Sequence, residues 1–273
     1  MNQTIGFIGG GNMATSLIGG LIKTGKVKPE QIKLFEPNTD KAKDLANTYG
    51  IQITASNFEL IEQAAIVVIA VKPQVLQSVV TPLAEAFKNN KPLIVSVVAG
   101  ITVSCIEQWL DSEHAVVRVM PNTPALVGMG ASGLFANTRV SSEQRADSQQ
   151  LVDAIGKSAW VESEQQIDAI TALSGSGPAY FMLFIQSLID AAIAAGIDAD
   201  TAKTLAVQTA AGSASLIESS DDDLKTLIDN VTSPGGTTEQ ALLSFQQSEL
   251  PSIVDKAFKA AQQRSIELSK ELA

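Results

Sequence analysis

The sequence predicts an α/β protein with an N-terminal doubly wound parallel sheet and a C-terminal all-helical domain. Two observations support this prediction. Across the first half, short runs rich in valine and isoleucine alternate with helix-compatible segments, which is the pattern of parallel strands covered on both faces. After about residue 163 the strand signals stop and only helical patterns follow. We therefore expect two domains, residues 1–162 and residues 163–273.

The strands of the first domain are predicted from near-continuous apolar runs. Five runs qualify, at residues 4–9, 32–36, 65–71, 93–99 and 115–120. Helix-compatible segments lie between them at residues 12–24, 39–49 and 104–110, and the first two are followed by glycines. Two further runs, at residues 132–137 and 157–162, are predicted to be additional edge strands.

The second domain is predicted from six helical segments. They are residues 165–173, 178–196, 200–218, 222–230, 238–247 and 250–272. Several contain stretches of small residues, such as "AAIAAG" and "AVQTAAGSAS". Small residues let helix backbones approach closely, which suits packing within a domain or between subunits.

The composition excludes several classes of function. The chain has 273 residues, of which 45% are hydrophobic and 18% charged, as in globular proteins. The formal net charge is −10 and the Lys and Arg residues are scattered, so the basic footprint of a nucleic-acid-binding protein is absent. The single cysteine, Cys105, excludes an intrachain disulfide framework and a cysteine zinc site, and no metal site is predicted. We expect Cys105 to pack as a small apolar group.

The localisation is predicted from two segments. The N-terminus has no basic region followed by a long apolar run, so it does not resemble a signal peptide. The most apolar segment, residues 179–196, contains Gln186 and Asp190 and is shorter than the ~20 apolar residues that a membrane span needs. We interpret it as a buried core helix and expect a cytoplasmic protein that binds no membrane.

A glycine-rich motif follows the first predicted strand. In "GFIGGGNMA", Gly9, Gly11 and Ala14 fit the pattern G-x-G-x-x-A of Rossmann-type dinucleotide-binding domains. Gly9 would permit a tight turn, Gly11 would let the backbone approach a pyrophosphate, and Ala14 would let the helix pack close to the sheet. The first amides of the helix would bind the phosphates. A strand before the motif and a helix after it favour cofactor binding over a structural turn.

The second predicted strand ends at Glu36. A carboxylate at this place usually accepts hydrogen bonds from the ribose hydroxyls of NAD. However, Asn38, Thr39 and Lys41 follow and could hold a 2′-phosphate instead, and Pro37 could turn Glu36 away. The choice between NADH and NADPH therefore stays open.

Two further strand ends carry candidate cofactor contacts. Lys72 and Pro73 follow the run at residues 65–71, and Ala99 and Gly100 lie at the end of the next run. Ligands bind at the C-terminal edges of strands in such sheets. Ala99 and Gly100 are small enough to let a flat nicotinamide ring approach the backbone, whereas Lys72 is equally well explained as a surface lysine.

The segment "VTSPGGTT", residues 231–238, connects two predicted helices and combines hydroxyl groups with glycine amides. Thr237 or Thr238 could cap the second helix, and the remaining groups predict an anion site at the same place. The only histidine, His114, lies in a polar segment that we predict to be a surface loop. Because no strong acid–base group is evident, the pattern suggests a substrate such as an iminium ion, which accepts hydride without an alkoxide stage.

Five motifs together resemble the pyrroline-5-carboxylate reductase family over essentially the whole chain. They are "GFIGGGNMA", "AVKPQ", "RVMPNTPA", "LSGSGPAY" and "NVTSPGGTTEQAL", of which the last is highly specific. The resemblance implies reduction of the cyclic imine 1-pyrroline-5-carboxylate to L-proline with NADPH or NADH, the last step of proline biosynthesis. It also implies a Rossmann domain followed by a helical dimerisation domain. The protein would be a homodimer at least, with assembly up to a decamer of five dimers.

The resemblance also implies roles for individual residues. The pyrophosphate would be held by Ile8, Gly9, Gly10, Gly11, Asn12 and Met13. Further cofactor contacts would come from Asn57, Val71, Lys72, Pro73, Ala99, Gly100 and, reaching across from the partner subunit, Asn230; Glu36 and Asn38 complete the predicted cofactor set. The substrate carboxylate would be bound by Ser233, Gly235, Gly236 and Thr237. Thr238 would hydrogen-bond the ring nitrogen and is the predicted catalytic residue. Family members that prefer NADPH often have Ser or Asn-Arg where this chain has Glu36-Pro37.

Three alternatives stay open. The motifs "RVMPNTPA" and "LSGSGPAY" could be rigid scaffold as readily as substrate contacts. A β-hydroxyacid or 6-phosphogluconate-type dehydrogenase also joins a Rossmann domain to a helical one, but it needs a catalytic lysine with asparagine four residues later. Here Lys203 is followed by Val207 and Lys225 by Asp229. A non-catalytic nucleotide sensor is the third alternative, which an activity assay separates from an enzyme.

Overall fold

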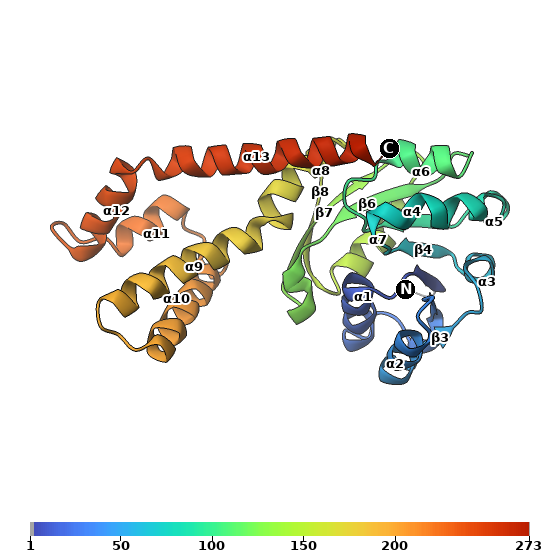
Figure 1. The fold of residues 1–273 in the computed structure, drawn as a ribbon, viewed down its shortest axis with the longest axis horizontal. Helices are drawn as coiled ribbons and strands as arrows, with labels where there is room; N and C mark the ends of the chain where they lie inside the picture. The colour runs from blue at the N-terminus through green and yellow to red at the C-terminus, as the bar shows by residue number, and fades with distance from the viewer. Residues whose placement is uncertain (1–2, 273) are drawn as a thin grey trace. The chain divides into compact units, whose positions relative to one another are not determined.

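The computed structural model describes residues 3–272 and arranges eight strands of that range in a single sheet (Figure 1). The strand order is β3-β2-β1-β4-β5-β6-β7-β8, and every neighbouring pair is parallel except β6 and β7. The order changes direction between β1 and β4, which is where ligands bind in doubly wound sheets. The strands are β1 Ile5–Ile8, β2 Ile32–Phe35, β3 Gln52–Ile53, β4 Ile66–Ile69, β5 Leu93–Ser96, β6 Val116–Met120, β7 Gly130–Ala136 and β8 Gly156–Trp160.

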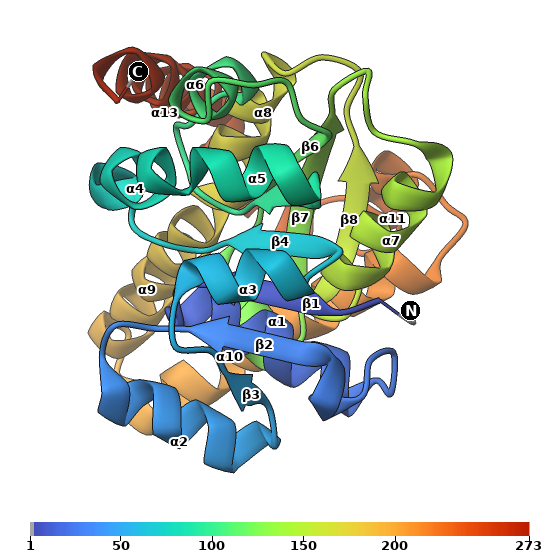
Figure 2. The same cartoon turned by 90° about the vertical axis from the view of Figure 1, so that its right-hand side faces the viewer.

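Different helices cover the two faces of the sheet, and each strand contributes to both cores because its successive residues point to opposite sides. Ile5 and Phe7 of β1 pack in one core with α1, α2 and α7, whereas Ile8 packs in the other core with α3 to α6. Figure 2 shows α3 and α5 in front of the sheet. The helices are α1 Asn12–Lys23, α2 Thr39–Tyr49, α3 Asn57–Gln63, α4 Pro73–Val80, α5 Ala84–Asn90, α6 Val103–Trp109 and α7 Ser142–Val152, with 3₁₀ turns at Pro29–Gln31, Thr81–Leu83 and Thr123–Val127.

The helices and strands described after β8 are all helices. They are α8 Gln166–Ile170, a π-helical turn at Thr171–Gly175, α9 Gly177–Ala194, α10 Ala199–Ser219, α11 Leu224–Asn230, α12 Thr237–Gln247 and α13 Leu250–Glu271. The predicted fold class is therefore confirmed. By internal packing the chain divides into a first unit, up to Ser176 and from Ala261 on, and a second unit, Gly177–Ala260. The division into functional domains at residues 162 and 163 stays a prediction.

All the predicted strands are present, but one of them was misplaced. β8 forms an edge of the sheet, as expected. β7 lies between β6 and β8, so its prediction as an edge strand is wrong. The reason is the 3₁₀ turn Thr123–Val127, a short connection that brings the chain back antiparallel to β6 and leaves a free edge on which β8 pairs. The sequence did not predict β3, α3, α4, α5 or α7.

The prediction that residues 179–196 form a buried core helix is wrong for the single chain. Of α9, only Gly177 and Ile189 are buried, whereas Phe181 and Leu183 are 73% and 70% exposed. Within the described residues, Gln166–Ala194 is also the segment long and apolar enough to cross a membrane by length and composition. The sequence correctly predicted an apolar helix, but the prediction that its side chains are buried within the single chain is wrong.

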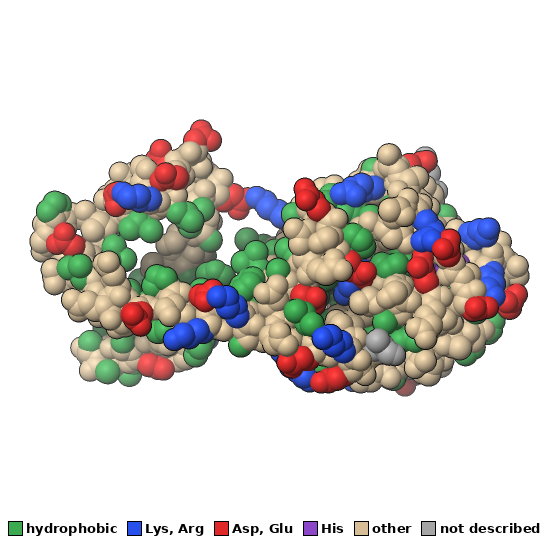
Figure 3. Space-filling model, turned by 90° about the horizontal axis from the view of Figure 1, so that it is seen from above, with side chains coloured by type: hydrophobic (Ala, Val, Ile, Leu, Met, Phe, Trp, Pro, Cys, Tyr) green, Lys and Arg blue, Asp and Glu red, His purple; other side chains and the backbone are tan. Residues whose placement is uncertain are grey.

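Exposed hydrophobic side chains occur on all five helices that contribute to the second unit. Leu205 and Leu216 of α10, Ile228 of α11 and Val254 of α13 are exposed in addition to those of α9. Figure 3 shows such side chains gathered on the helices of this unit. Extended exposed apolar surface on a globular chain marks an interaction site, because it is costly to leave in water.

His114 is buried, so its prediction as a surface residue is wrong. Its side chain is 3% exposed and its ring packs edge-on against Phe87 at 5.9 Å between centroids. Its Nε2 lies 2.6 Å from Ser112 Oγ, and Asn137 Nδ2 donates to its carbonyl oxygen at 2.8 Å. These contacts tie the segment before β6 to α5 and β7. Burial lowers the pKa of His114 below its usual 6.5, and the nearby positive charge of Lys91 lowers it further.

Stability is therefore expected to decrease below about pH 6.5, because the unfolded chain then binds a proton that the folded chain resists. In the His114→Gln variant, the fall of the thermal unfolding midpoint between about pH 7 and about pH 5 should be smaller than in the unsubstituted protein. For each protein, the quantity compared is the difference between its unfolding midpoints at the two pH values. A loss of stability that is the same at both pH values therefore does not affect the result. If the unfolding midpoint fell equally in both proteins, the lowered pKa of His114 would not be the cause of the pH dependence.

Candidate functional site

The glycine-rich loop lies at the C-terminal end of β1, as the motif predicts. Gly9 has φ +96° and its amide donates to Phe35 O at 2.9 Å. A Cβ at Gly9 would lie 2.9 Å from both Ala70 O and Val71 Cγ1, so the turn has no room for a side chain. Gly11 is the N-cap of α1 and provides no side-chain cap. The first amides of α1 are therefore available to an anion, which is what a pyrophosphate requires.

Glu36 faces the glycine-rich loop and is not turned away by Pro37. Its Oε2 accepts a hydrogen bond from Gly10 N at 2.8 Å, and its Oε1 accepts one from Asn38 N at 3.0 Å. Asn38 caps α2, because its Oδ1 accepts from Lys41 N at 3.1 Å. The residues that the sequence places at the ribose end of a dinucleotide are thus brought together beside the loop.

The remaining cofactor candidates of the first unit also follow strands or begin helices. Asn57 is the first residue of α3, and its Oδ1 is buried without a hydrogen-bond partner in the described structure. Lys72 occupies the N-cap position of α4 with Pro73 in the first turn. The Lys72 side chain is exposed, which is compatible with either interpretation of this residue.

The loop after β5 carries Ala99, which is exposed, and Gly100, which has φ +76°. A Cβ at Gly100 would lie 3.1 Å from the Leu272 side chain and 3.8 Å from the backbone of Leu268. The end of α13 therefore covers one side of Gly100. A larger residue at position 100 would push against this helix, while Ala99 beside it is open to solvent.

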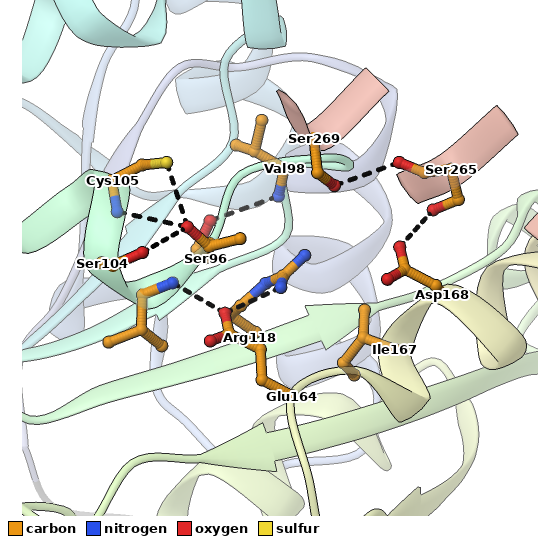
Figure 4. Close-up of polar contacts among 12 residues, drawn as sticks. Ser96, Val98, Ser104, Cys105, Arg118, Glu164, Ile167, Asp168, Ser265 and Ser269 are labelled. Atoms are coloured by element: carbon orange, nitrogen blue, oxygen red, sulfur yellow. Dashed lines mark hydrogen bonds and ion pairs between the residues drawn. The ribbon is translucent and has the colours of Figure 1, made fainter. Parts of the chain in front are cut away.

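Buried charges hold the segment after this loop in place (Figure 4). Arg118 on β6 is 5% exposed, and its Nη1 lies 2.8 Å from Glu164 Oε1. The same oxygen accepts from Val103 N, the first residue of α6, at 2.7 Å. Nearby, Ser265 Oγ of α13 donates to Asp168 Oδ1 at 2.7 Å. The carboxylates of Glu164 and Asp168 thus join β6, α6 and α13 around the Gly100 loop.

Sequence reasoning did not identify Glu164, Asp168 or Ser265. The available signal was Arg118, a cation inside an apolar strand, because a buried charge requires a partner. The sequence does not say where that partner lies, 46 residues later. Cys105, which is buried in the core beside this network, packs as the small group that was expected.

The motif "RVMPNTPA" contains a structural asparagine. Asn122 is buried; its Nδ2 donates to Ser174 O at 3.0 Å and its Oδ1 accepts from Ala131 N at 2.9 Å. It therefore ties the turn after β6 to β7 and to the π-helical turn of "LSGSGPAY". For Asn122, the geometry favours the scaffold interpretation over substrate contact.

In the second unit, the segment from Asn230 to Thr238 joins α11 to α12. Gly235 has φ +73°, its amide donates to Glu239 Oε2 at 2.8 Å, and Gly236 N donates to Ser233 O at 2.9 Å. These bonds fold the segment into a tight turn. We call residues 233–238 the hydroxyl loop.

The threonines of the hydroxyl loop do not cap α12, contrary to the sequence prediction. The N-cap is Gly236, with no side-chain cap, and Thr237 is already the first helical residue. The hydroxyls of Ser233, Thr237 and Thr238 make no hydrogen bond with other described residues. The start of α12 therefore presents unpaired amides and free hydroxyls together, which is suited to binding a carboxylate.

No group of three or more His, Cys, Asp or Glu side chains within residues 3–272 could hold a metal ion.

Two family models match the chain. Residues 164–268 match a model described as pyrroline-5-carboxylate reductase dimerisation, and residues 4–100 match one described as NADP oxidoreductase coenzyme F420-dependent. A pyrroline-5-carboxylate reductase of Pseudomonas aeruginosa is 46% identical over 98% of this chain and 97% of its own length. The corresponding protein of Vibrio alginolyticus is 40% identical over 98% of each chain.

Solved structures give the same result. A pyrroline-5-carboxylate reductase from Coxiella burnetii superposes with a TM-score of 0.95 at 39% identity, over 98% of this chain and 99% of that one. A Plasmodium falciparum pyrroline carboxylate reductase, solved with NADP bound, gives a TM-score of 0.84 at 32% identity, over 98% of both chains.

Proposed function

Since this chain belongs to the pyrroline-5-carboxylate reductase family, we propose how its residues carry out that family's reaction. The protein is an NAD(P)H-dependent oxidoreductase of proline biosynthesis that reduces the C=N bond of 1-pyrroline-5-carboxylate to give L-proline. Its cofactor is NADPH or NADH, which supplies the hydride for the imine carbon.

The cofactor is held by the C-terminal edge of the sheet. The uncapped start of α1 and the Gly9 turn that excludes a side chain fit a pyrophosphate, and this observation supports the assignment. Glu36 and Asn38 bind at the ribose end, and the buried unpaired Oδ1 of Asn57 is an acceptor available to the adenosine part. The complete proposed set is Ile8, Gly9, Gly10, Gly11, Asn12, Met13, Glu36, Asn38, Asn57, Val71, Lys72, Pro73, Ala99, Gly100 and, from the partner subunit, Asn230.

The substrate is bound by the hydroxyl loop. The observation that carries this proposal is the coincidence of free hydroxyls and unpaired amides at the start of α12. Ser233, Gly235, Gly236 and Thr237 line the place of the substrate carboxylate, and Thr238 hydrogen-bonds the ring nitrogen. The donors to the carboxylate are the hydroxyls of Ser233 and Thr237 and the first amides of α12, since the amides of Gly235 and Gly236 already donate within the loop. An imine that arrives protonated needs no strong acid from the protein, so orientation of the substrate provides most of the rate enhancement.

The assay that tests this function follows the oxidation of NADH and NADPH with and without 1-pyrroline-5-carboxylate. We expect oxidation that depends on the imine and yields proline. Binding of the dinucleotide without any oxidation would support a nucleotide sensor instead. Oxidised cofactor that is reduced by a β-hydroxyacid, with no activity on the imine, would support the rival dehydrogenase class.

The second unit supplies the contact between subunits. Residues 164–268 match a dimerisation model, and the apolar faces of α9 and α10 are exposed in the single chain, so the protein oligomerises. We propose a homodimer at least, further assembled into a decamer of five dimers, located in the cytoplasm and bound to neither membrane nor nucleic acid. Light scattering coupled to size-exclusion chromatography distinguishes a dimer from a decamer, and a monomer would contradict both.

A further inference from the structure

Glu36 occupies a defined position at the rim of the proposed cofactor site. Its two carboxylate oxygens accept from amides on opposite sides, Gly10 N of the glycine-rich loop and Asn38 N of the turn before α2. A Cβ built on Gly10 would lie 3.3 Å from Glu36 Oε2, so the carboxylate lies directly against the loop. These contacts fix the side chain toward the place where the adenosine ribose of a dinucleotide lies in such folds.

The chemistry of this position favours one cofactor over the other. An ionised carboxylate only accepts hydrogen bonds, and each of its oxygens has capacity beyond the single bond it makes here. The two hydroxyls of an unmodified ribose are donors that can use this capacity. A 2′-phosphate lacks such donors. Its negative charge would also lie beside the negative charge of the Glu36 carboxylate, and the two would repel each other.

The charges of the neighbouring residues do not offset the carboxylate of Glu36. The backbone amide of Asn38 donates to Glu36 Oε1 and its Oδ1 accepts from Lys41 N, which leaves the side-chain Nδ2 as its remaining donor. Between residues 36 and 41, Glu36 and Asp40 provide two carboxylates against one ammonium group, that of Lys41. No described ion pair neutralises Glu36.

We infer that Glu36 makes this chain select NADH over NADPH, by accepting from the ribose hydroxyls and repelling a 2′-phosphate. The inference rests on the proposed function and narrows its cofactor to the form without the 2′-phosphate. It depends on the carboxylate at the end of β2 and not on the glycine-rich motif.

The test measures dissociation constants of NADH and NADPH by titration calorimetry, without substrate, for the unsubstituted protein, Glu36→Gln and Glu30→Gln. We expect the unsubstituted protein to bind NADH ~10-fold to ~100-fold more tightly than NADPH. In E36Q the ratio should fall at least ~10-fold, with NADPH bound more tightly and NADH more weakly. E30Q removes the same charge from the exposed turn before β2, at the opposite end of that strand, and should leave the ratio unchanged.

Opposite changes for the two cofactors separate selectivity from folding, because a general loss of structure weakens both. A melting curve of E36Q confirms that the variant is folded. Equal affinities, or tighter NADPH binding, in the unsubstituted protein would overturn the inference and leave the proposed reduction intact. Failure to bind either dinucleotide would instead contradict the proposed function. The ratio of kcat/KM values for the two cofactors should change in the same direction as the ratio of dissociation constants.

Discussion

The Gly9→Ala variant is expected to lose at least ~10-fold in affinity for NADH and NADPH, and its kcat/KM for the cofactor should fall by a similar factor. Gly9 has φ +96°, a conformation that costs an L-residue of order 1–3 kcal/mol. The added Cβ would also lie 2.9 Å from Ala70 O, which is backbone and cannot rotate away. The loop must therefore move, and the amides at the start of α1 move with it. Calorimetric titration with each dinucleotide measures the effect.

Gly25→Ala is the matched control. Gly25 has φ +66°, so alanine is strained there too, but a Cβ at this position has nothing within 4 Å. It follows α1 at the end remote from the proposed pyrophosphate site. We expect a lower unfolding temperature and an unchanged cofactor affinity. If Gly9→Ala bound both dinucleotides as tightly as Gly25→Ala does, the role of the Gly9 turn would be wrong.

The Thr238→Ala variant should reduce kcat/KM for 1-pyrroline-5-carboxylate by roughly five- to a hundredfold. This range corresponds to the loss of one hydrogen bond to the reacting ring, about 1–3 kcal/mol. Thr238 lies in the first turn of α12 and its hydroxyl makes no hydrogen bond with other described residues, so removing it leaves the fold intact. Thr238→Ser, which retains the hydroxyl, should recover most of the activity. Steady-state kinetics at saturating cofactor measures both variants.

Thr232→Ala is the control for Thr238→Ala in the same connection. The Thr232 hydroxyl donates to Ile228 O at 2.7 Å, so it is already used by the end of α11. We expect its removal to alter stability slightly and kcat/KM little. A wild-type kcat/KM in Thr238→Ala, or an equal loss in Thr232→Ala, would show that the Thr238 hydroxyl does not act on the substrate.

Much of the sheet could be predicted from the sequence because its strands are buried on both faces. The runs that form β1, β4 and β5 are apolar at every or nearly every position, and this pattern needs no knowledge of the neighbouring strands. Three of the elements that were missed are very short. α3 and α5 have seven residues each and β3 has two, so their formation depends on packing against the rest of the unit.

The errors at α9 and His114 share one physical cause. Phe181 and Leu183 are apolar, but the sequence does not show whether residues of the same chain or of another chain bury their side chains. His114 follows three polar residues, Asp111 to Glu113, yet Phe87 from α5 packs against its ring. In both cases burial is decided by segments distant in the sequence.

Some features of the candidate site could likewise be predicted from local sequence signals, and others could not. Gly9, Gly11 and Glu36 were predicted because a glycine motif and a strand end are local signals with known geometry. That Glu36 faces the loop, and that Glu164 and Asp168 anchor the segments around Gly100, required the three-dimensional structure. The free hydroxyls of the hydroxyl loop were predicted as an anion site, and the structure added that the N-cap of α12 is Gly236.

The first unit is not continuous in the chain, since residues from Ala261 on pack with residues up to Ser176. A ribosome that adds ~5–20 residues per second must first synthesise everything from Gly177 to Ala260, which takes roughly 4–17 seconds. During that interval Gly100 has no Leu272 beside it and Asp168 has no Ser265 hydroxyl. The last contacts of the first unit can therefore form only after the whole second unit has been translated. A messenger RNA that slows translation between codons 177 and 260 lengthens the exposure of this unfinished surface to chaperones and proteases.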